Sequence, residues 1–294
     1  MDLSLKDDAW FGEWTARWDV MQDAYVPRRR EAFALIAGML VEQFPERCRV
    51  VDLGAGAGTL AETILNRHPN ASVICLDVEP FLLEAARRRL SSFGERAKVV
   101  RYDLREDGLA TGEDGGHGGA CPTTLTRRSG SGDVGRALPR PPSSYGREIF
   151  EKKQVDAVVC STTAHWFSEA RLSGLYASAA GVLGDDGLVL VVDHIPPDDE
   201  VLARVALEMN EGEITCRLQQ SGAPTWEEFW EALGPAVGMP DYAAAVAAPA
   251  WGVQDGPEAG HTIAAHRRLL QAAGFSHIAE LWRCFNDALL VARR

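Results

Sequence analysis

A glycine-rich loop follows a short apolar run near residue 50. The segment reads VVDLGAGAGTL from Val50 to Leu60, with glycines at positions 54, 56 and 58. Glycine permits positive φ angles, and a strand, a glycine loop and a helix in succession present backbone N–H groups to a ligand. A nucleotide-binding unit of this kind also needs an acid at the end of the next strand, about 20 residues further on, to accept the ribose hydroxyls. Asp77, which ends VICLD, is such an acid.

The spacing of the glycines separates two kinds of cofactor. Dinucleotide-binding loops use G-x-G-x-x-G, in which the loop packs against a pyrophosphate. Here residues 54–58 read GAGAG behind Asp52, and Thr59 stands where the third glycine would fall. The spacing therefore disfavours an NAD(P)-dependent oxidoreductase, which stays open as an alternative. A glycine loop alone can be mere turn chemistry, whereas the loop and Asp77 together indicate a nucleotide-like cofactor.

Strand-like and helix-like segments alternate along most of the chain. Valine-rich runs predict five strands, in RVVDLG, SVICLD, AKVVRYDL, VDAVVCS and GLVLVVDH. Helical segments lie between most of them, and one begins at Pro80. The C-terminal part adds a helix and two strands around a turn at Asn286-Asp287. We therefore predict an α/β fold with a doubly wound, mostly parallel sheet of seven strands.

Three regions depart from this alternation. Residues 1–45 predict two helices, the second opened by Pro27, that form an N-terminal helical cap. Residues 46–294 form the main domain, and two insertions interrupt it. Glycine, serine, proline and threonine dominate residues 108–146, which predicts a disordered insertion. Residues 197–260 are mainly helical and predict a second cap.

Composition and charge limit the partners. The chain has 294 residues, 46% of them hydrophobic, and a formal net charge of −12, which disfavours nucleic acid and anionic membranes. Its six cysteines form no CxxC pair, so we expect neither a zinc site nor a disulfide framework, and a reducing compartment fits. The N-terminus is unlike a secretory signal, and no apolar stretch is long enough to span a bilayer. We expect a cytoplasmic protein without a metal.

The glycine loop and its surroundings are similar to a known family. The segment VVDLGAGAGTLAETILNRHPNASVICLDVEPFLLEAARRRL resembles the cofactor half of class I S-adenosylmethionine (SAM)-dependent methyltransferases. The family signature is an acid, then G-x-G-x-G, then an acid that ends the second strand. The resemblance covers about Arg49 to Asp193, apart from the insertion. It implies a Rossmann-like methyltransferase fold, with residues 46–294 as the methyltransferase domain, and SAM as the cofactor.

The resemblance implies a role for individual residues. Asp52 and the loop 54–58 would face the amino-acid part of SAM, Asp77 would hold the ribose, and Val78 would pack on the adenine. Asp103 would lie near the adenine amine, although an ordinary helix cap is an alternative for it, as core packing is for Val78. The expected cofactor-binding residues are Asp52, Gly54, Ala55, Gly56, Gly58, Asp77, Val78, Asp103, Leu104 and Ser161.

A second likeness follows the fourth strand. The segment STTAHWFSEARLSGLYASAAGVLGDDGLVLVVDHI is similar to a small-molecule branch that includes trans-aconitate methyltransferases, where this strand ends in a histidine-tryptophan pair, here His165-Trp166. RWDVMQDAYVPRRREAF looks like the cap helices that close over the substrate in that branch, and residues 184–187 fit its turn before the fifth strand. The likeness implies a small-molecule acceptor, methylated on an O, N or C atom, and no nucleic-acid or membrane partner.

His165 is the candidate catalytic base. A histidine titrates near neutrality, and this one stands at the end of the fourth strand. The alternative is that it only packs or hydrogen-bonds at a helix start. His194, just after the fifth strand, is a weaker candidate, and His261 and His266 are weaker still.

Tryptophans are the candidate acceptor-binding residues. We expect Trp14, Trp18 and Trp166 in the acceptor site, although a stripe at helical spacing also suits simple packing. Trp226 and Trp230 raise the same question in the second cap. Arg28–Arg30 could neutralise a carboxylate on cofactor or substrate or be a solvated helix start.

Three functions stay open. They are a small-molecule methyltransferase, which the resemblance favours, a catalytically silent SAM-binding protein, and a nucleotide-dependent oxidoreductase. The sequence predicts neither the acceptor nor the oligomeric state.

Overall fold

A computed structural model describes residues 3, 6–104, 155–247 and 260–294. The insertion expected at 108–146 and the end of the second cap lie outside the described residues. The division into domains and caps therefore stays a prediction, while the elements within the described ranges can be compared with the sequence.

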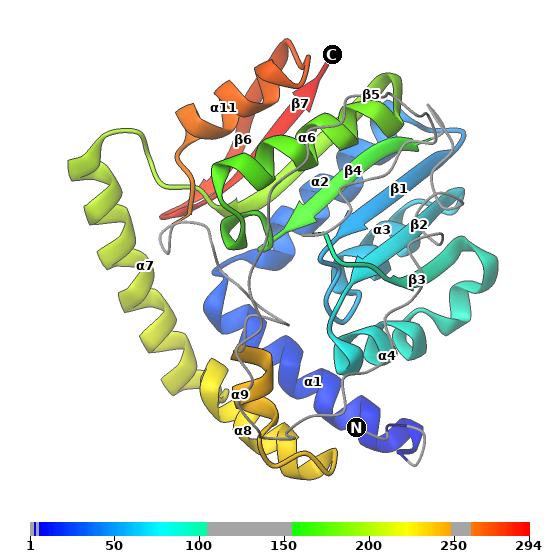
Figure 1. The fold of residues 1–294 in the computed structure, drawn as a ribbon, viewed down its shortest axis with the longest axis vertical. Coiled ribbons are helices and arrows are strands. Elements are labelled where there is room, and N and C mark those ends of the chain that lie inside the picture. Colours follow the sequence, from blue (N-terminus) through cyan, green and yellow to red (C-terminus); the bar gives the residue numbers. More distant parts are fainter. Residues whose placement is uncertain (1–2, 4–5, 105–154, 248–259) are drawn as a thin grey trace, which may run out of the picture.

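A seven-stranded sheet forms the centre of the molecule (Figure 1). The strands are β1 (Cys48–Leu53), β2 (Ala71–Asp77), β3 (Ala97–Arg101), β4 (Val155–Ser161), β5 (Leu183–His194), β6 (His277–Cys284) and β7 (Asp287–Arg293). Their order is β3-β2-β1-β4-β5-β7-β6. Strands β1 to β5 pair in parallel, and β7 is antiparallel to both β5 and β6. The predicted fold class, a doubly wound and mostly parallel sheet, is confirmed.

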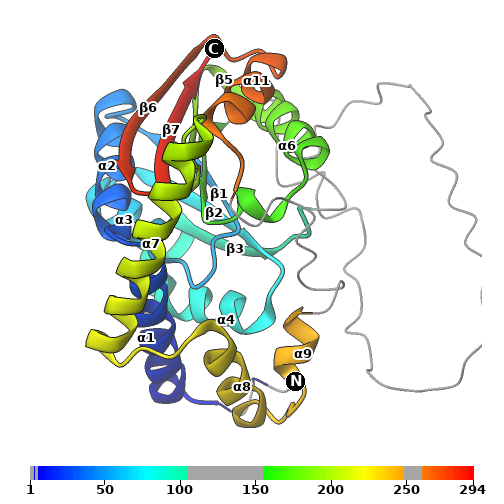
Figure 2. The same ribbon diagram turned by 90° about the vertical axis from the view of Figure 1, so that its left-hand side faces the viewer.

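Helices cover both faces of the sheet (Figure 2). One face carries α2 (Arg29–Gln43) and α3 (Thr59–Arg67), and the other carries α6 (Glu169–Val182) and α11 (Ile263–Ala272). The period of two along a strand explains this arrangement. On β1, Val51 and Leu53 join the core beneath α6 and α11, whereas Val50 packs with the core beneath α2 and α3.

A layer of helices lies beyond the carboxyl ends of the parallel strands (Figure 1). It consists of α1 (Asp8–Tyr25), α4 (Pro80–Arg89), α7 (Glu200–Ser221), α8 (Trp226–Ala236) and α9 (Tyr242–Ala247). Aromatic side chains of α1, α4, α8 and α9 share a third core, which includes Phe11, Phe81, Phe229 and Tyr242. Two short 3-10 helices complete the described elements, η1 (Ser91–Arg96) and η2 (Ala164–Trp166).

Two local expectations differ from the structure. The second helix begins at Arg29 rather than at Pro27, because Arg28 takes a left-handed conformation with a φ of 57° between them. Residues 184–187, expected as a turn, lie within β5, where the pairing with β4 jumps from Leu183 to Leu188. Residues 184–187 therefore form a bulge within β5 rather than a turn before it.

Candidate active site

A cavity of about 420 Å³ opens at the carboxyl ends of the central strands. Its walls come from the loops after β1, β2, β3, β4 and β5, and from side chains of α1, α2, α8 and α9. In an open parallel α/β sheet, ligands bind at this edge, where the strand order reverses. Here β1 lies between β2 and β4, so its loop occupies that reversal point.

The glycine loop closes the β1 end of the cavity. Gly54, Gly56 and Gly58 have φ angles of 66°, 54° and 81°, a region that residues with a side chain rarely adopt. A Cβ on Gly54 would lie 2.1 Å from Thr163 Oγ1, so this glycine also allows the β1 and β4 loops to touch. Gly54, Ala55, Gly56 and Ala57 line the cavity, whereas Gly58, an expected cofactor residue, is not among the described residues that line it.

Asp52 places a carboxyl group without partners beneath the loop. The residue is 1% exposed, and neither carboxyl oxygen makes a hydrogen bond within the described part of the chain. Burial, with a contribution from the charge of Asp77, raises the pKa of Asp52 to about 7. A buried acceptor without a partner costs free energy, so a ligand that brings a donor to Asp52 would be favoured.

Asp77 lies at the end of β2 and faces the same loop. Its Oδ2 accepts a hydrogen bond from the Gly56 N–H at 2.8 Å, and its Oδ1 accepts from the N–H groups of Val78 and Glu79 at 2.7 and 2.9 Å. Burial raises the pKa of Asp77, and these three N–H groups oppose the rise. Since a carboxylate offers about four acceptor positions, about one remains, on Oδ2. The sequence predicted that Asp77 accepts both ribose hydroxyls, whereas this arrangement has room for one direct bond.

The remaining expected cofactor residues follow β2 and β3, apart from Ser161, which ends β4. Val78, Asp103, Leu104 and Ser161 all line the cavity. Glu79 was not expected from the sequence: it is 7% exposed, caps the N-terminus of α4 and accepts a hydrogen bond from the Tyr242 hydroxyl of α9. Burial raises the pKa of Glu79 to about 7. The helical layer is thereby tied to the loop after β2.

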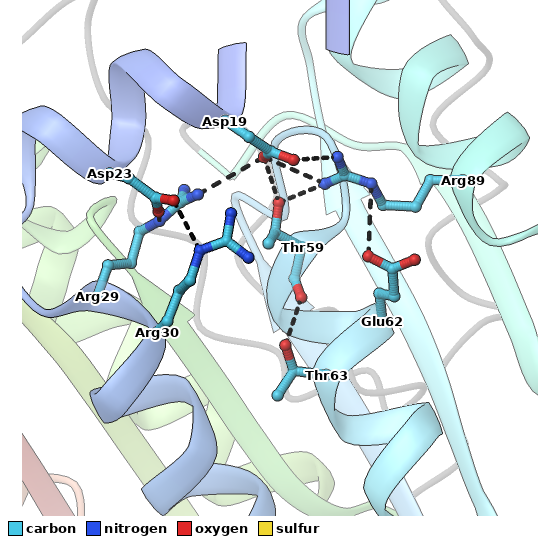
Figure 3. A network of polar contacts seen from close by, with 8 residues as sticks. All are labelled: Asp19, Asp23, Arg29, Arg30, Thr59, Glu62, Thr63 and Arg89. Carbon is cyan, nitrogen blue, oxygen red and sulfur yellow. Dashed lines mark hydrogen bonds and ion pairs between the residues drawn. The ribbon is translucent and has the colours of Figure 1, made fainter. Parts of the chain in front are cut away.

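An ionic network ties α1 to the glycine-loop side of the cavity (Figure 3). Asp19 of α1 accepts a hydrogen bond from Thr59 Oγ1 at 2.9 Å and forms an ion pair with Arg89 of α4. Asp23 accepts from Arg29 at 2.9 Å. Arg29, 5% exposed, lines the cavity, whereas Arg30 is mainly exposed and reaches Asp23 from outside. Of the arginine run, then, Arg29 alone lines the described part of the cavity.

His165 forms a dyad with a buried carboxylate at the β4 end. Its Nδ1 lies 2.6 Å from Oδ1 of Asp193, the penultimate residue of β5, which is 0% exposed. Oδ2 of Asp193 accepts the N–H groups of Thr163 and Ala164 at 2.9 and 2.6 Å, so one carboxylate orients both the loop and the ring. Burial alone would raise the pKa of Asp193, but His165 and then His194 bring it below its ordinary value. The ionised Asp193 accepts from Nδ1–H, and Nε2 of His165 is left for a ligand.

His194 forms a second dyad beside the first. Its Nδ1 lies 2.6 Å from Oδ1 of Asp287, the first residue of β7, and its ring centroid lies 4.7 Å from that of His165. Burial lowers the pKa of His194, but the hydrogen bond to Asp287 and the charges of Asp287 and Asp193 raise it more, and the net shift is upward. Burial raises the pKa of Asp287, and His194 opposes this. His194 was the weaker candidate in the sequence, and the structure places it next to His165 on the cavity wall.

Among the described residues, four tryptophans line the cavity: Trp18, Trp226 and Trp230 from the helical layer, and Trp166 from η2. Trp18 lies with its ring centroid 5.7 Å from those of both Trp226 and Trp230. Trp14, expected in the acceptor site, instead packs against Phe229 in the third core and is not among the described residues that line the cavity. These two tryptophans of the α1 stripe therefore have different surroundings. Trp18 lines the cavity, whereas Trp14 packs against Phe229.

His261 and His266 have structural partners, and neither is among the described residues that line the cavity. Nε2 of His261 lies 2.7 Å from the Phe167 carbonyl oxygen, and Nδ1 of His266 lies 2.6 Å from the Tyr176 hydroxyl. Burial lowers the pKa of His266 to about 4. Among the described residues, no group of three His, Cys, Asp or Glu side chains is placed to hold a metal ion. Within the same residues, no helix combines the length and apolarity needed to cross a bilayer.

Comparisons with known proteins agree with this geometry. A family model described as "Methyltransferase small domain" matches residues 34–112, which include the loop and Asp77. Residues of the chain are 40% identical over 85 positions to ribosomal RNA small subunit methyltransferase H of Corynebacterium glutamicum, covering 29% of this chain and 25% of that protein. They are 32% identical over 78 positions to malonyl-[acyl-carrier protein] O-methyltransferase of Geobacter sulfurreducens, covering 26% and 29%. The chain thus spans about a quarter of the length of these curated relatives.

The fold is also that of solved methyltransferases. Human N-acetylserotonin methyltransferase in complex with SAM superposes with a TM-score of 0.51 at 15% identity, covering 97% of this chain and 58% of that chain. At this identity the likeness concerns the fold. The fold and the family match agree with the expected class, a class I SAM-dependent methyltransferase. The finer likeness to trans-aconitate methyltransferases stays a prediction.

The residues at the β1–β2 end fit SAM. The cofactor carries an amino group, which suits the buried and unpartnered oxygens of Asp52. Its ribose hydroxyl can donate to the remaining position on Asp77 Oδ2, and the loop glycines leave the backbone open to close approach. Asp52, Asp77 and the loop 54–58 are therefore the residues that would hold it.

Proposed function

We propose that this chain transfers a methyl group from SAM to an oxygen atom of a small-molecule acceptor, with His165 as the general base. One observation carries the proposal: a single cavity joins the glycine loop and Asp77 at one end to the His165–Asp193 dyad at the other. A cofactor held at the first end would extend towards the second. The dyad supports an oxygen acceptor, because a hydroxyl must lose a proton and an imidazole can take it.

Each residue has a separate task in this proposal. Nε2 of His165 accepts the proton of the acceptor hydroxyl. Asp193 keeps the proton on Nδ1 and stabilises the imidazolium that forms. The tryptophans of the helical layer exclude water and orient the acceptor. When bound, SAM supplies an electrophilic methyl group, whose bond to sulfur breaks as the bond to the acceptor oxygen forms, and S-adenosylhomocysteine is released.

A small acceptor is favoured over RNA, although some relatives are named as ribosomal RNA methyltransferases. Two such matches cover 85 and 55 residues, which are 25% and 17% of the relative's length. The net charge of −12 opposes binding to a phosphate backbone. The wall opposite the sheet is rich in tryptophan, and an apolar wall of this kind is typical of small-molecule pockets.

The experiment has a binding part and a transfer part. Calorimetry with S-adenosylhomocysteine, and with NAD⁺ as the comparison, should show binding of the first compound only. Labelled SAM is then offered with a panel of hydroxylated metabolites and, separately, with ribosomal RNA. We expect label in a small molecule. Absence of S-adenosylhomocysteine binding, or label in RNA alone, would contradict the proposal.

A further inference from the structure

Two imidazole rings share the acceptor end of the cavity. The centroids of His165 and His194 lie 4.7 Å apart with their planes at 51°. Each ring turns its Nδ1 towards a buried aspartate at 2.6 Å. Within the described part of the chain, each ring forms its hydrogen bond through Nδ1, so Nε2 is the nitrogen left for a ligand, and both residues line the cavity. The site therefore presents two neighbouring ring nitrogens to one ligand.

The charges around the cavity show which ligand suits these nitrogens. The carboxyl groups that line it, Asp52, Asp77, Glu79 and Asp103, all follow or belong to β1, β2 and β3. At the β4–β5 end, Asp193 and Asp287 are covered by their histidines and are 0% exposed. An ammonium acceptor would need a carboxylate facing it, whereas oxygen atoms can both donate to and accept from imidazole. The acceptor end thus favours oxygen atoms.

The two rings differ in the carboxylates that surround them. His194 has the raised pKa, and two positive rings in contact would repel each other. The groups that face His194 are His165 on η2, Asp193 on its own strand and Asp287 on β7. His194, beside the carboxylates of Asp287 and Asp193, is the ring suited to donate from Nε2, which leaves Nε2 of His165 as the acceptor. His165 therefore suits a hydroxyl that loses its proton. His194 suits a second oxygen atom that accepts a hydrogen bond from the ring.

The aromatic walls favour a flat ligand. Trp166 lies 5.2 Å from His165 and 6.4 Å from Trp226, measured between ring centroids, and all three line the cavity. Trp226 lies 5.5 Å from Trp230. Indole faces bind planar rings by stacking and edge contacts, and they bind cations as well, but the charge distribution disfavours a cation here.

We propose that the acceptor is a planar ring compound with oxygen atoms on two neighbouring carbons, one facing His165 and the other bound by His194. His194 is then a specificity-determining residue for the acceptor. This inference rests on the proposed methyl transfer, because it concerns the same cavity. It goes beyond that proposal in naming a substrate class and a second histidine that touches the substrate.

The test uses binding, so it does not require the natural acceptor. The full chain is saturated with S-adenosylhomocysteine and titrated calorimetrically with catechol and, separately, with phenol. Catechol carries two neighbouring oxygens and phenol one, on rings of the same size. We expect catechol to bind at least ~10-fold more tightly, the effect of one additional hydrogen bond to a charged group. In His194→Gln this ratio should fall towards one, and it should be unchanged in His277→Gln, an exposed histidine at the start of β6.

A second variant separates loss of the ring from loss of the fold. Asp287→Asn keeps an acceptor for Nδ1 of His194 but removes the charge that holds its proton, so the ratio should fall there too. Equal affinities for the two probes in the native chain, an unchanged ratio in both variants, or no binding of either probe while S-adenosylhomocysteine binds would overturn this inference alone. Absence of S-adenosylhomocysteine binding would instead overturn the proposed function.

Discussion

The two ends of the cavity use the same side chain in different ways. At the β1–β2 end, the carboxyl groups of Asp52 and Asp77 line the cavity themselves and can accept hydrogen bonds from a ligand. At the β4–β5 end, Asp193 and Asp287 lie behind imidazole rings at 2.6 Å. An aspartate in contact with the ligand recognises donors, whereas an aspartate behind a histidine fixes its orientation and its affinity for a proton. Residues suited to binding a ligand directly thus lie at the β1–β2 end, and residues suited to acid–base chemistry lie at the β4–β5 end.

The largest expected effect comes from removing the ring at the acceptor end. His165→Gln should lower the turnover of the acceptor found in the transfer assay by roughly 10²–10⁴-fold, the range for a lost acid–base group. The affinity for S-adenosylhomocysteine should stay as it is, because the loop and Asp77 are untouched. Steady-state kinetics and calorimetry on the same preparation measure both quantities.

His277→Gln is the matched control for this change, since His277 is exposed and lies at the far end of β6. A native turnover in His165→Gln would show that the ring only supports the loop after β4. The two ends of the cavity would then no longer differ in acid–base chemistry, and alignment of the acceptor would account for the reaction.

The difference between the ends also explains what the sequence could predict. The cofactor end is local: Asp52, the loop and Asp77 lie in one strand–loop–helix–strand unit, so their types and spacing already indicated a ligand site. The acceptor end is assembled from η2, β5 and β7, and Asp287 reaches His194 across 93 positions of sequence. Asp193, the partner of His165, directly precedes His194 in the sequence, so this acid could have been noticed beside a candidate base. No residue near Asp287 indicated that it pairs with His194. Periodicity likewise predicted all seven strands, whereas it could not separate Trp14 from Trp18, because both lie on one stripe.

At the cofactor end, Asp77→Ala should weaken S-adenosylhomocysteine binding by roughly 10–100-fold. The variant loses an acceptor for the ribose and leaves the N–H groups of Gly56, Val78 and Glu79 without their shared partner. Calorimetry gives the affinity, and circular dichroism tests whether the variant is folded. Asp186→Ala, at an exposed residue in the β5 bulge, is the control. An unchanged affinity in the folded Asp77 variant would remove this residue from the site.

The contact between the two ends is tested at Gly54. An alanine there would place Cβ 2.1 Å from Thr163 Oγ1 at a φ of 66°, so Gly54→Ala should lower the free energy of unfolding by about 1–3 kcal/mol. Urea unfolding measures this loss. Thr163→Ala in the same chain should recover part of it, because the overlaps with Oγ1 and Cγ2 disappear while the 2.9 Å approach to Cβ and the positive φ remain. Purely additive effects of the two changes would show that the loops do not press on each other.

The smallest expected effect is the pH dependence of stability from the second dyad. The pKa of His194 is raised in the folded chain, so the folded state holds this proton more tightly than the unfolded chain does. Its contribution is therefore fully present below the ordinary histidine pKa of about 6.5 and is lost as the pH rises through the raised value. Because the ring is partly exposed and the raised pKa of Asp287 weakens the pair in acid, we expect a difference of about 1 kcal/mol or less. Urea unfolding of the native chain and of His194→Gln, compared from about pH 5.5 upwards, should show a stability difference that shrinks with rising pH. A difference that grows with pH would mean that His194 is neutral in the folded chain, and His165 and His194 would then not divide the roles of acceptor and donor.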